Sequence, residues 1–288
     1  MNQRFAKGLV SAAWGLAAVG ILIVLWELYK WVGETTNIPL PANYDDASMP
    51  HIWVILGGFF EPEVRGSDTA VWQTVAAGAG RSLLIAVGGF VIGVSIGLLL
   101  AILMERSQLA ERSLLPYVIA SQTVPLIALA PLVVGIGNRI KIGEFQWTQT
   151  QSVMLIAAYL AFFPISVGAL RGLKAPTAAH LELMRSYAAK PNAILWKLRF
   201  PSSIPYLIPA LKVSAAAAIV GTVVAEISTG ARGGVGRLIV EYAREATSQP
   251  GKVYVAVFGA ALLGLIGAGL VTLIDVIATR NLPREGVA

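Results

Sequence analysis

The sequence is dominated by apolar segments that are long enough to cross a lipid bilayer. A transmembrane helix needs about 20 apolar residues to cross roughly 30 Å of hydrocarbon. Stretches of this length lie at about residues 10–32, 74–103, 114–137, 151–171, 206–228 and 253–278. Charged residues make up 13% of the chain, against about 25% in a typical globular domain. The sequence therefore predicts an all-α, polytopic membrane protein with six transmembrane helices, the first of them an uncleaved span.

The composition also limits the chemistry that the chain can perform. It has no cysteine and two histidines, so we expect no disulfide, no thiolate chemistry and no metal site. The acidic residues of the spans, Glu27, Glu226 and Asp275, lie near span ends rather than at mid-depth, where a proton relay is expected. The net charge of +6 comes without a basic patch interleaved with aromatic residues, which argues against a nucleic-acid partner. We expect neither an enzyme nor a cofactor in this chain, so energy comes from another protein or the chain is a passive channel or scaffold.

One polar interval, Leu181 to Pro205, differs from the rest of the second half of the chain. Its apolar residues follow a helical spacing of four, which predicts two short amphipathic helices. Pro191 suits the first turn of the second helix, and Pro201 is expected to end it. Two interpretations remain open at this point. The helices either lie flat on the lipid surface or dock a soluble partner.

This interval resembles the cytoplasmic "EAA" loop of permeases from ATP-binding-cassette (ABC) importers. Glu182 matches the glutamate of that motif, Ala188 stands at the position of its glycine, and Pro201 matches its closing proline, although Leu183 and Met184 replace the two alanines. The text that follows, PYLIPALKVSAAAAIVGTVVAEI, is similar to the nitrate/taurine/sulfonate branch of the family. The upstream text SQTVPLIALAPLVVGIG is similar to the same branch. The resemblance covers the chain from about residue 70 onward and extends to riboflavin- and hydroxymethylpyrimidine-type permeases.

The resemblance implies the type I ABC importer permease fold, in a multi-pass protein of the bacterial cytoplasmic membrane. A second permease copy is implied as partner, with a homodimer favoured. Two cytoplasmic ATP-binding subunits and an extracytoplasmic solute-binding protein complete the assembly, and ATP is bound by the ATPase subunits rather than by this chain. The solute would be a vitamin or vitamin precursor, or a sulfonate- or nitrate-type anion. The residues that the resemblance assigns to the ATPase-coupling loop are Glu182, Leu183, Met184, Tyr187, Ala188, Leu195, Trp196 and Pro201.

The chain divides into two predicted parts. Residues 1–73 hold the first span and an extracytoplasmic segment, in which residues 51–60 are expected to form a short interfacial helix. Residues 74–288 form the permease core, with the coupling loop at about 173–205. Lys and Arg are more numerous on the side of the membrane that holds this loop, which places the loop and both termini in the cytoplasm.

Several residues are candidates for the translocation path. The third predicted span contains three prolines that interrupt its hydrogen-bond ladder, and such breaks either help packing or line a pathway. The span at 206–228 is rich in small residues and is a candidate for the middle of a dimer. The path candidates are Gln122, Thr123, Pro125, Ser214 and Glu226, the last of which is otherwise expected to be solvated at the interface.

Two further features have open alternatives. Gly89, Gly93, Gly97 and Ala101 form a smooth ridge on the second predicted span, which serves packing within the subunit or, less favoured, a subunit interface. Arg81 either extends to the membrane surface or contacts a transported anion. A stand-alone secondary transporter or channel is the alternative to the importer subunit.

Overall fold

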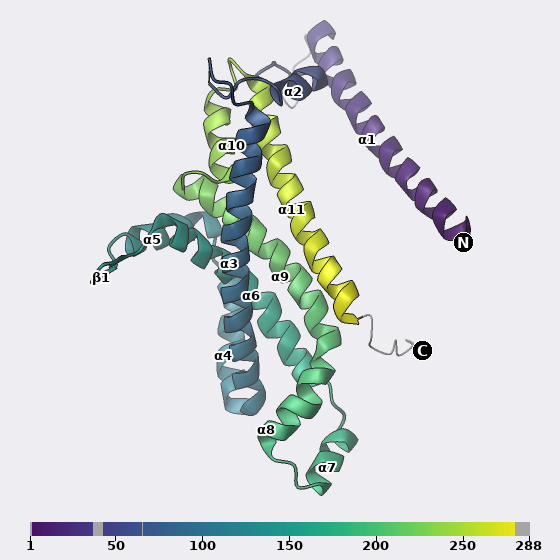
Figure 1. Cartoon of the computed structure of the whole chain (residues 1–288), viewed down its shortest axis with the longest axis vertical. Coiled ribbons are helices and arrows are strands. Elements are labelled where there is room, and N and C mark those ends of the chain that lie inside the picture. Colours follow the sequence, from purple (N-terminus) through teal and green to yellow (C-terminus); the bar gives the residue numbers. More distant parts are fainter. Residues whose placement is uncertain (1, 37–42, 65, 280–288) are drawn as a thin grey trace. The chain divides into compact units, whose positions relative to one another are not determined.

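The computed structural model describes residues 2–36, 43–64 and 66–279. The chain forms two compact units, Met1–Val75 with Ile239–Val257, and Ala76–Leu238 with Phe258–Ala288. Helices account for nearly all of the regular structure (Figure 1), which confirms the predicted all-α class. Five described helices are long and apolar enough to cross a membrane, and a sixth span is completed if one bent pair of helices counts as a span.

The first unit holds the start of the chain. Its elements are α1 (Asn2–Thr36), α2 (Ile52–Gly58), and the adjoining parts of α3 (Val71–Arg106), α10 (Val235–Arg244) and α11 (Pro250–Thr279). Helix α2 is the short helix predicted at 51–60. Polar contacts attach α1 to the segment before α2, because Trp26 donates to the Pro50 carbonyl over 3.0 Å. The Glu27 carboxylate accepts from the Ile52 amide over 2.8 Å, so it caps the first turn of α2.

The second unit holds the remaining elements. They are α4 (Gln108–Ala120), the 3₁₀ turn η1 (Ser121–Thr123), α5 (Leu126–Gly137), the strands β1 (Lys141–Ile142) and β2 (Phe145–Gln146), α6 (Gln149–Leu173), α7 (Ala178–Ser186), α8 (Pro191–Ile194), the π-helical turn η2 (Leu195–Arg199) and α9 (Phe200–Thr229). The two strands pair as an antiparallel hairpin. The core lies between α6 and α9, which pack along much of their length.

Small residues make this core possible. A methyl group added at Gly93 would lie 2.6 Å from Ala161 Cβ on α6, and one added at Gly89 would lie 2.5 Å from Ala157 Cβ. The glycine ridge of α3 therefore packs within the subunit, as the favoured interpretation predicted. Residues 93–97 also match a GxSxG pattern. They are continuous helix, however, and Ser95 Oγ donates to the Val91 carbonyl over 2.8 Å, so the pattern serves helix packing.

The third predicted span is broken rather than kinked. The helical stretch Gln108–Thr123 and helix α5 meet at an angle of 102°. Pro125 is the N-cap of α5, and its ring excludes a helical conformation at Val124, which is extended. Pro116 and Pro131, by contrast, lie inside helices. All three prolines lack the amide donor of the hydrogen-bond ladder, as predicted, but only Pro125 stands where one helix ends and the next begins.

The α3–α6 contact predicts a large difference between two glycines of one helix. Gly93→Ala should lower the free energy of unfolding by about 1–3 kcal/mol, because the added methyl overpacks against α6. Gly80 has open space around it, so Gly80→Ala should leave stability unchanged or raise it by up to about 1 kcal/mol. Thermal unfolding of both variants in detergent measures the difference, and equal midpoints would contradict the packing described here.

Candidate functional site

The segment between α6 and α9 forms a helical hairpin, here called the coupling hairpin, residues 177–199. Thr177 caps α7 by accepting from the His180 amide. Helix α7 ends at Ser186, and Ala188 follows with φ of 53°. It is the one non-glycine residue with positive φ in the described part of the chain. An L-residue in this conformation costs roughly 1–2 kcal/mol relative to glycine. The left-handed turn falls at the position where the EAA motif carries its glycine. Glycine adopts this conformation without strain, which explains why the motif has a glycine there.

The second half of the coupling hairpin is continuous with a membrane span. Pro191 opens α8 at its first turn, as predicted. Pro201, predicted to end this helix, instead lies in the first turn of α9. Helical structure therefore runs from Pro191 to Thr229 as one 39-residue stretch. The stretch contains the π-helical turn and Pro201, Pro205 and Pro209, so its hydrogen-bond ladder is irregular. The coupling hairpin and α9 are nevertheless joined without a loop between them.

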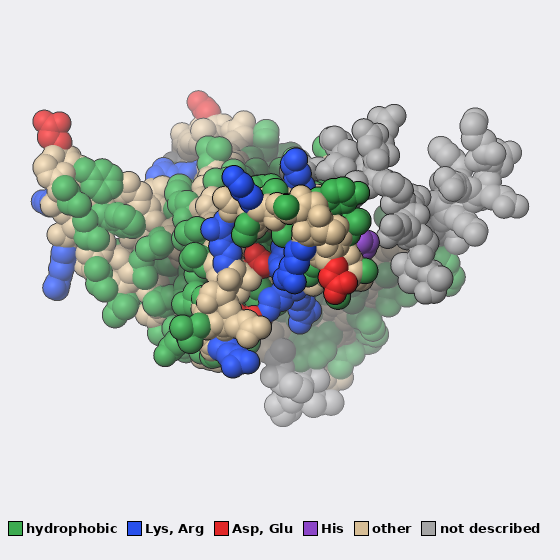
Figure 2. Space-filling view, turned by 90° about the horizontal axis from the view of Figure 1, so that it is seen from below, with side chains coloured by type: hydrophobic (Ala, Val, Ile, Leu, Met, Phe, Trp, Pro, Cys, Tyr) green, Lys and Arg blue, Asp and Glu red, His purple; other side chains and the backbone are tan. Residues whose placement is uncertain are grey.

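Three apolar side chains of the coupling hairpin are strongly exposed. Leu183 is 55% exposed, Tyr187 77% and Trp196 57%. Glu182 and Pro201 are exposed as well, and Met184 is half-buried. Figure 2 views the end of the molecule where α7 and α8 lie, and Lys and Arg side chains gather there among apolar ones. The surface combines aromatic anchors with a basic surround, a composition typical of protein docking sites.

Leu195 departs from the predicted pattern. It was expected on the docking surface, but it is 4% exposed and packs against Met104 of α3 and Leu170 and Leu173 of α6. The π-helical turn that begins at Leu195 changes the register of the apolar stripe. Leu195 therefore anchors the coupling hairpin to its own subunit.

Charged residues reinforce this anchorage. Arg199 forms an ion pair with Glu105 at the end of α3. The neighbouring Arg106 donates to Asn192 of α8 over 2.9 Å, and Lys174 pairs with Glu111 of α4. Both partners of the Arg199–Glu105 pair are partly buried, which reduces the screening of the pair by solvent. Sequence reasoning did not identify these pairs, because their members lie far apart in the chain.

The path candidates separate into three places. Gln122, Thr123 and Pro125 lie together and exposed at the break between α4 and α5. Ser214 is buried and donates to the Ala161 carbonyl, so it joins α9 to α6. Glu226 lies elsewhere and is also buried.

The environment of Glu226 corrects the expectation of interfacial solvation. Its side chain is 1% exposed. Ser82 Oγ donates to it over 2.8 Å, and the Gly236 amide donates over 2.9 Å. The Val235 amide in turn donates to Ser82 Oγ over 2.9 Å. Glu226 and Ser82 therefore cap the start of α10, where a carboxylate also meets the positive end of the helix dipole.

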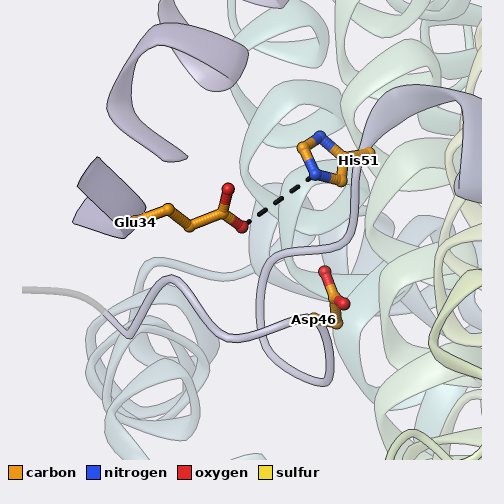
Figure 3. A group of neighbouring side chains, drawn as sticks. All are labelled: Glu34, Asp46 and His51. Atoms are coloured by element: carbon orange, nitrogen blue, oxygen red, sulfur yellow. Dashed lines mark ion pairs between the residues drawn. The ribbon is translucent and has the colours of Figure 1, made fainter. Parts of the chain in front are cut away.

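One side-chain cluster in the first unit resembles a metal site. Glu34, Asp46 and His51 offer ligand atoms within 4.8 Å of one another (Figure 3). Lys30 Nζ, however, lies 2.5 Å from Asp46 and 3.4 Å from Glu34. Its hydrogen bond and charge hold the pKa of Asp46 below its ordinary value. The ammonium group takes the place of a cation, and the cluster attaches α1 to the segment before α2.

The conformation of Ala188 predicts a stabilising substitution. Ala188→Gly should relieve the strain at this turn and slow tryptic cleavage at Arg185, since local stability rises by roughly 1 kcal/mol. Ala188→Val should accelerate the same cleavage. Ala189→Gly is the matched control and should give no protection. Faster cleavage of the Ala188→Gly protein would show that the turn is not strained.

Comparisons with known proteins agree with this geometry. The family model of binding-protein-dependent transport system inner membrane components matches residues 93–280. The formylaminopyrimidine transport permease protein of Halalkalibacterium halodurans is 32% identical over 62% of this chain and 67% of its own length. A permease protein of Bacillus subtilis named for aliphatic sulfonate transport is 30% identical over 91% of this chain and 84% of its own length. The riboflavin transport system permease protein of Chloroflexus aurantiacus is 27% identical over 76% and 72%.

The family, the helical architecture and the broken third span lead to the same conclusion, and none of these relatives is named as a stand-alone secondary transporter or channel. The chain belongs to the binding-protein-dependent transport system inner membrane component family, and it is a multi-pass permease subunit of an ABC importer with the type I fold.

Proposed function

We propose that this chain moves a small polar solute inward by alternating access, driven by two cytoplasmic ATPase subunits that grip the coupling hairpin. The observation that carries the proposal is the group of exposed anchors Leu183, Tyr187 and Trp196 on a hairpin that is attached to α3, α6 and α9. Exposed aromatic side chains on a fixed scaffold suit insertion into a groove on a partner. Glu182 would pair with a basic residue at the rim of that groove.

The continuous helical stretch formed by α8, η2 and α9 gives the proposal a mechanism. ATP is bound by the ATPase subunits, and this chain supplies no catalytic group and no cofactor. When the ATPase pair closes, it moves the coupling hairpin, and the continuous helix from Pro191 to Thr229 carries the movement into the membrane. The free energy available to the permease equals the difference in hairpin affinity between the two ATPase states.

The surface of α9 supports a homodimer. Tyr206, Val213, Val220 and Ile227 recur every seven residues and are all exposed in the single chain. Exposed Pro209 and Ala216 fill the positions between them, which completes a spacing of 3.5 residues. This spacing suits a left-handed crossing with the same helix of a second copy. Ala216 is small enough to allow the two helices to approach closely. Two copies with facing α9 helices would form a symmetric dimer.

The extracytoplasmic side is proposed to receive the solute-binding protein, on residues 34–72 and 229–250. Glu63, in the first of these intervals, is held by two hydrogen bonds. Buried Lys252 donates to the Glu63 carbonyl over 2.8 Å, and Tyr242 donates to the Glu63 carboxylate over 2.5 Å. Burial and the neighbouring carboxylates raise the pKa of Tyr242, so it stays protonated as a donor. Both termini would lie in the cytoplasm of a bacterium.

The solute class follows from the relatives. They are named for formylaminopyrimidine, aliphatic sulfonates and riboflavin. We propose a solute of the same kind, a vitamin or vitamin precursor or a sulfonate- or nitrate-type anion. The binding protein selects among them, because it is the chain that presents the solute.

Substitutions in the coupling hairpin test the proposal. Tyr187→Ala and Trp196→Ala should each weaken binding of the co-expressed ATPase subunit by roughly tenfold or more, since buried aromatic anchors carry most of the free energy of such interfaces. Membrane insertion should be unchanged. Co-purification in detergent and ATPase activity of the complex measure the effect.

The matched control is Phe145→Ala, which removes another exposed aromatic side chain, on β2. It should leave binding of the ATPase subunit unchanged. Full binding and activity of both hairpin variants would contradict the docking role.

A further inference from the structure

An open groove runs along one face of α4, in the second unit. Its volume is about 760 Å³. Residues of α4 three to four positions apart line it, so they share one helix face. The side chains that matter here are Arg112, Leu115, Pro116, Ile119, Ala120 and Lys174.

The polarity of this groove changes along its length. Its cytoplasmic end carries Arg112 together with the ion pair between Glu111 and Lys174, so the mouth has a net positive charge. The wall beyond the mouth is apolar. The α4 helix then ends at the break, where Gln122 and Thr123 are exposed. Figure 1 shows α4 leading from the hairpin end of the unit toward α5.

Arg112 at the membrane surface would place the break at about mid-depth of the bilayer. Ten residues separate Arg112 from Gln122, and at 1.5 Å per residue they rise by about 15 Å. That is half of the roughly 30 Å of hydrocarbon. Irregular backbone at this depth is tolerated only where it is buried in protein or lines a water-filled cavity. Thr123 Oγ1 donates to the Ala120 carbonyl over 2.8 Å and Gln122 Nε2 to Ser121 Oγ over 3.4 Å, but both side chains stay exposed at the break.

We propose that the α4 groove is the cytoplasmic half of the solute path, from a cationic mouth at Arg112 and Lys174 to the break at Gln122 and Thr123. The occupant is water together with a small polar or anionic solute. The inference rests on the proposed importer function and adds the wall of the path and the charge of its mouth. Lys174 follows the end of α6 and neighbours the base of the coupling hairpin, so movement of the hairpin reaches the mouth directly.

Cysteine accessibility tests the groove, because the chain has no native cysteine. Ile119 lines the groove, and Tyr117 lies on the opposite face of α4 with a larger exposed fraction, 76% against 53%. In inside-out vesicles that contain the assembled importer, Ile119→Cys should react with a charged, membrane-impermeant methanethiosulfonate at least roughly tenfold faster than Tyr117→Cys. Trapping the complex with ATP and vanadate should slow the reaction at Ile119→Cys severalfold.

A second pair of measurements tests the mouth. We consider the ratio of the reaction rate of an anionic methanethiosulfonate to that of a cationic one. This ratio should be higher at Ile119→Cys than with a free thiol in solution. Adding Arg112→Glu should lower this ratio by roughly threefold or more, because a charge at the mouth changes the local concentration of ions in the groove. Ala120→Cys, a smaller change in the same groove, repeats both measurements if Ile119→Cys fails to assemble.

Two results would overturn the inference. Equal reaction rates at the two faces of α4 would show that the groove is not a separate aqueous compartment. Labelling of Ile119→Cys and Ala120→Cys only by a lipid-soluble maleimide would show that an acyl chain fills the groove. Binding of the ATPase subunit through Tyr187 and Trp196, measured in the same vesicles, is independent of both results. Failure of the groove inference would therefore leave the importer function standing.

Discussion

The close approach of helices through small residues is the contact on which the permease core depends. Gly89, Gly93 and Gly97 bring α3 against α6, and Gly168 and Gly172 bring α6 against α9 near Ala210 and Ser203. In a bilayer the lipid tails are as apolar as the side chains, so helices associate through packing and hydrogen bonds rather than through the hydrophobic effect. Every larger side chain at these positions would separate the helices. The ion pairs and caps discussed above act on a scaffold that this packing has already fixed.

The coupling hairpin joins that scaffold at several points. Leu195 is buried among α3 and α6, Arg199 pairs with Glu105, and the second half of the hairpin continues into α9. A flexible loop on a long tether could bind a partner equally well, but it would transmit no movement. Apolar burial and paired charges attach the hairpin to the helices of its unit, while Tyr187 and Trp196 remain exposed. Attachment and exposed aromatic side chains are thus divided between the two sides of one short element, as the proposed docking requires.

Polar side chains of the second unit are buried at two of the predicted path positions and exposed at the break between α4 and α5. Glu226 and Ser214 are buried with hydrogen-bond partners, so their cost of desolvation is offset. Gln122 and Thr123 are exposed beside a broken helix in a segment of membrane depth. This difference in exposure separates Glu226 and Ser214 from Gln122 and Thr123, which were all path candidates in the sequence. The break between α4 and α5 is therefore a stronger candidate for contact with solute than the polar residues of α9.

The sequence by itself determined the approximate positions of the apolar spans and the presence of two short amphipathic helices between the fourth and fifth of them. These features depend on local composition and spacing, which a linear pattern records. Only the tertiary structure decided that Leu195 faces inward, that Glu226 caps α10, that Pro201 continues a helix, and that α4 and α5 meet at 102°. Each of these outcomes depends on contacts between residues distant in the chain or on the direction that the backbone takes after a break. Hydropathy measures how apolar a helix face is, but it carries no information about which neighbour that face will meet.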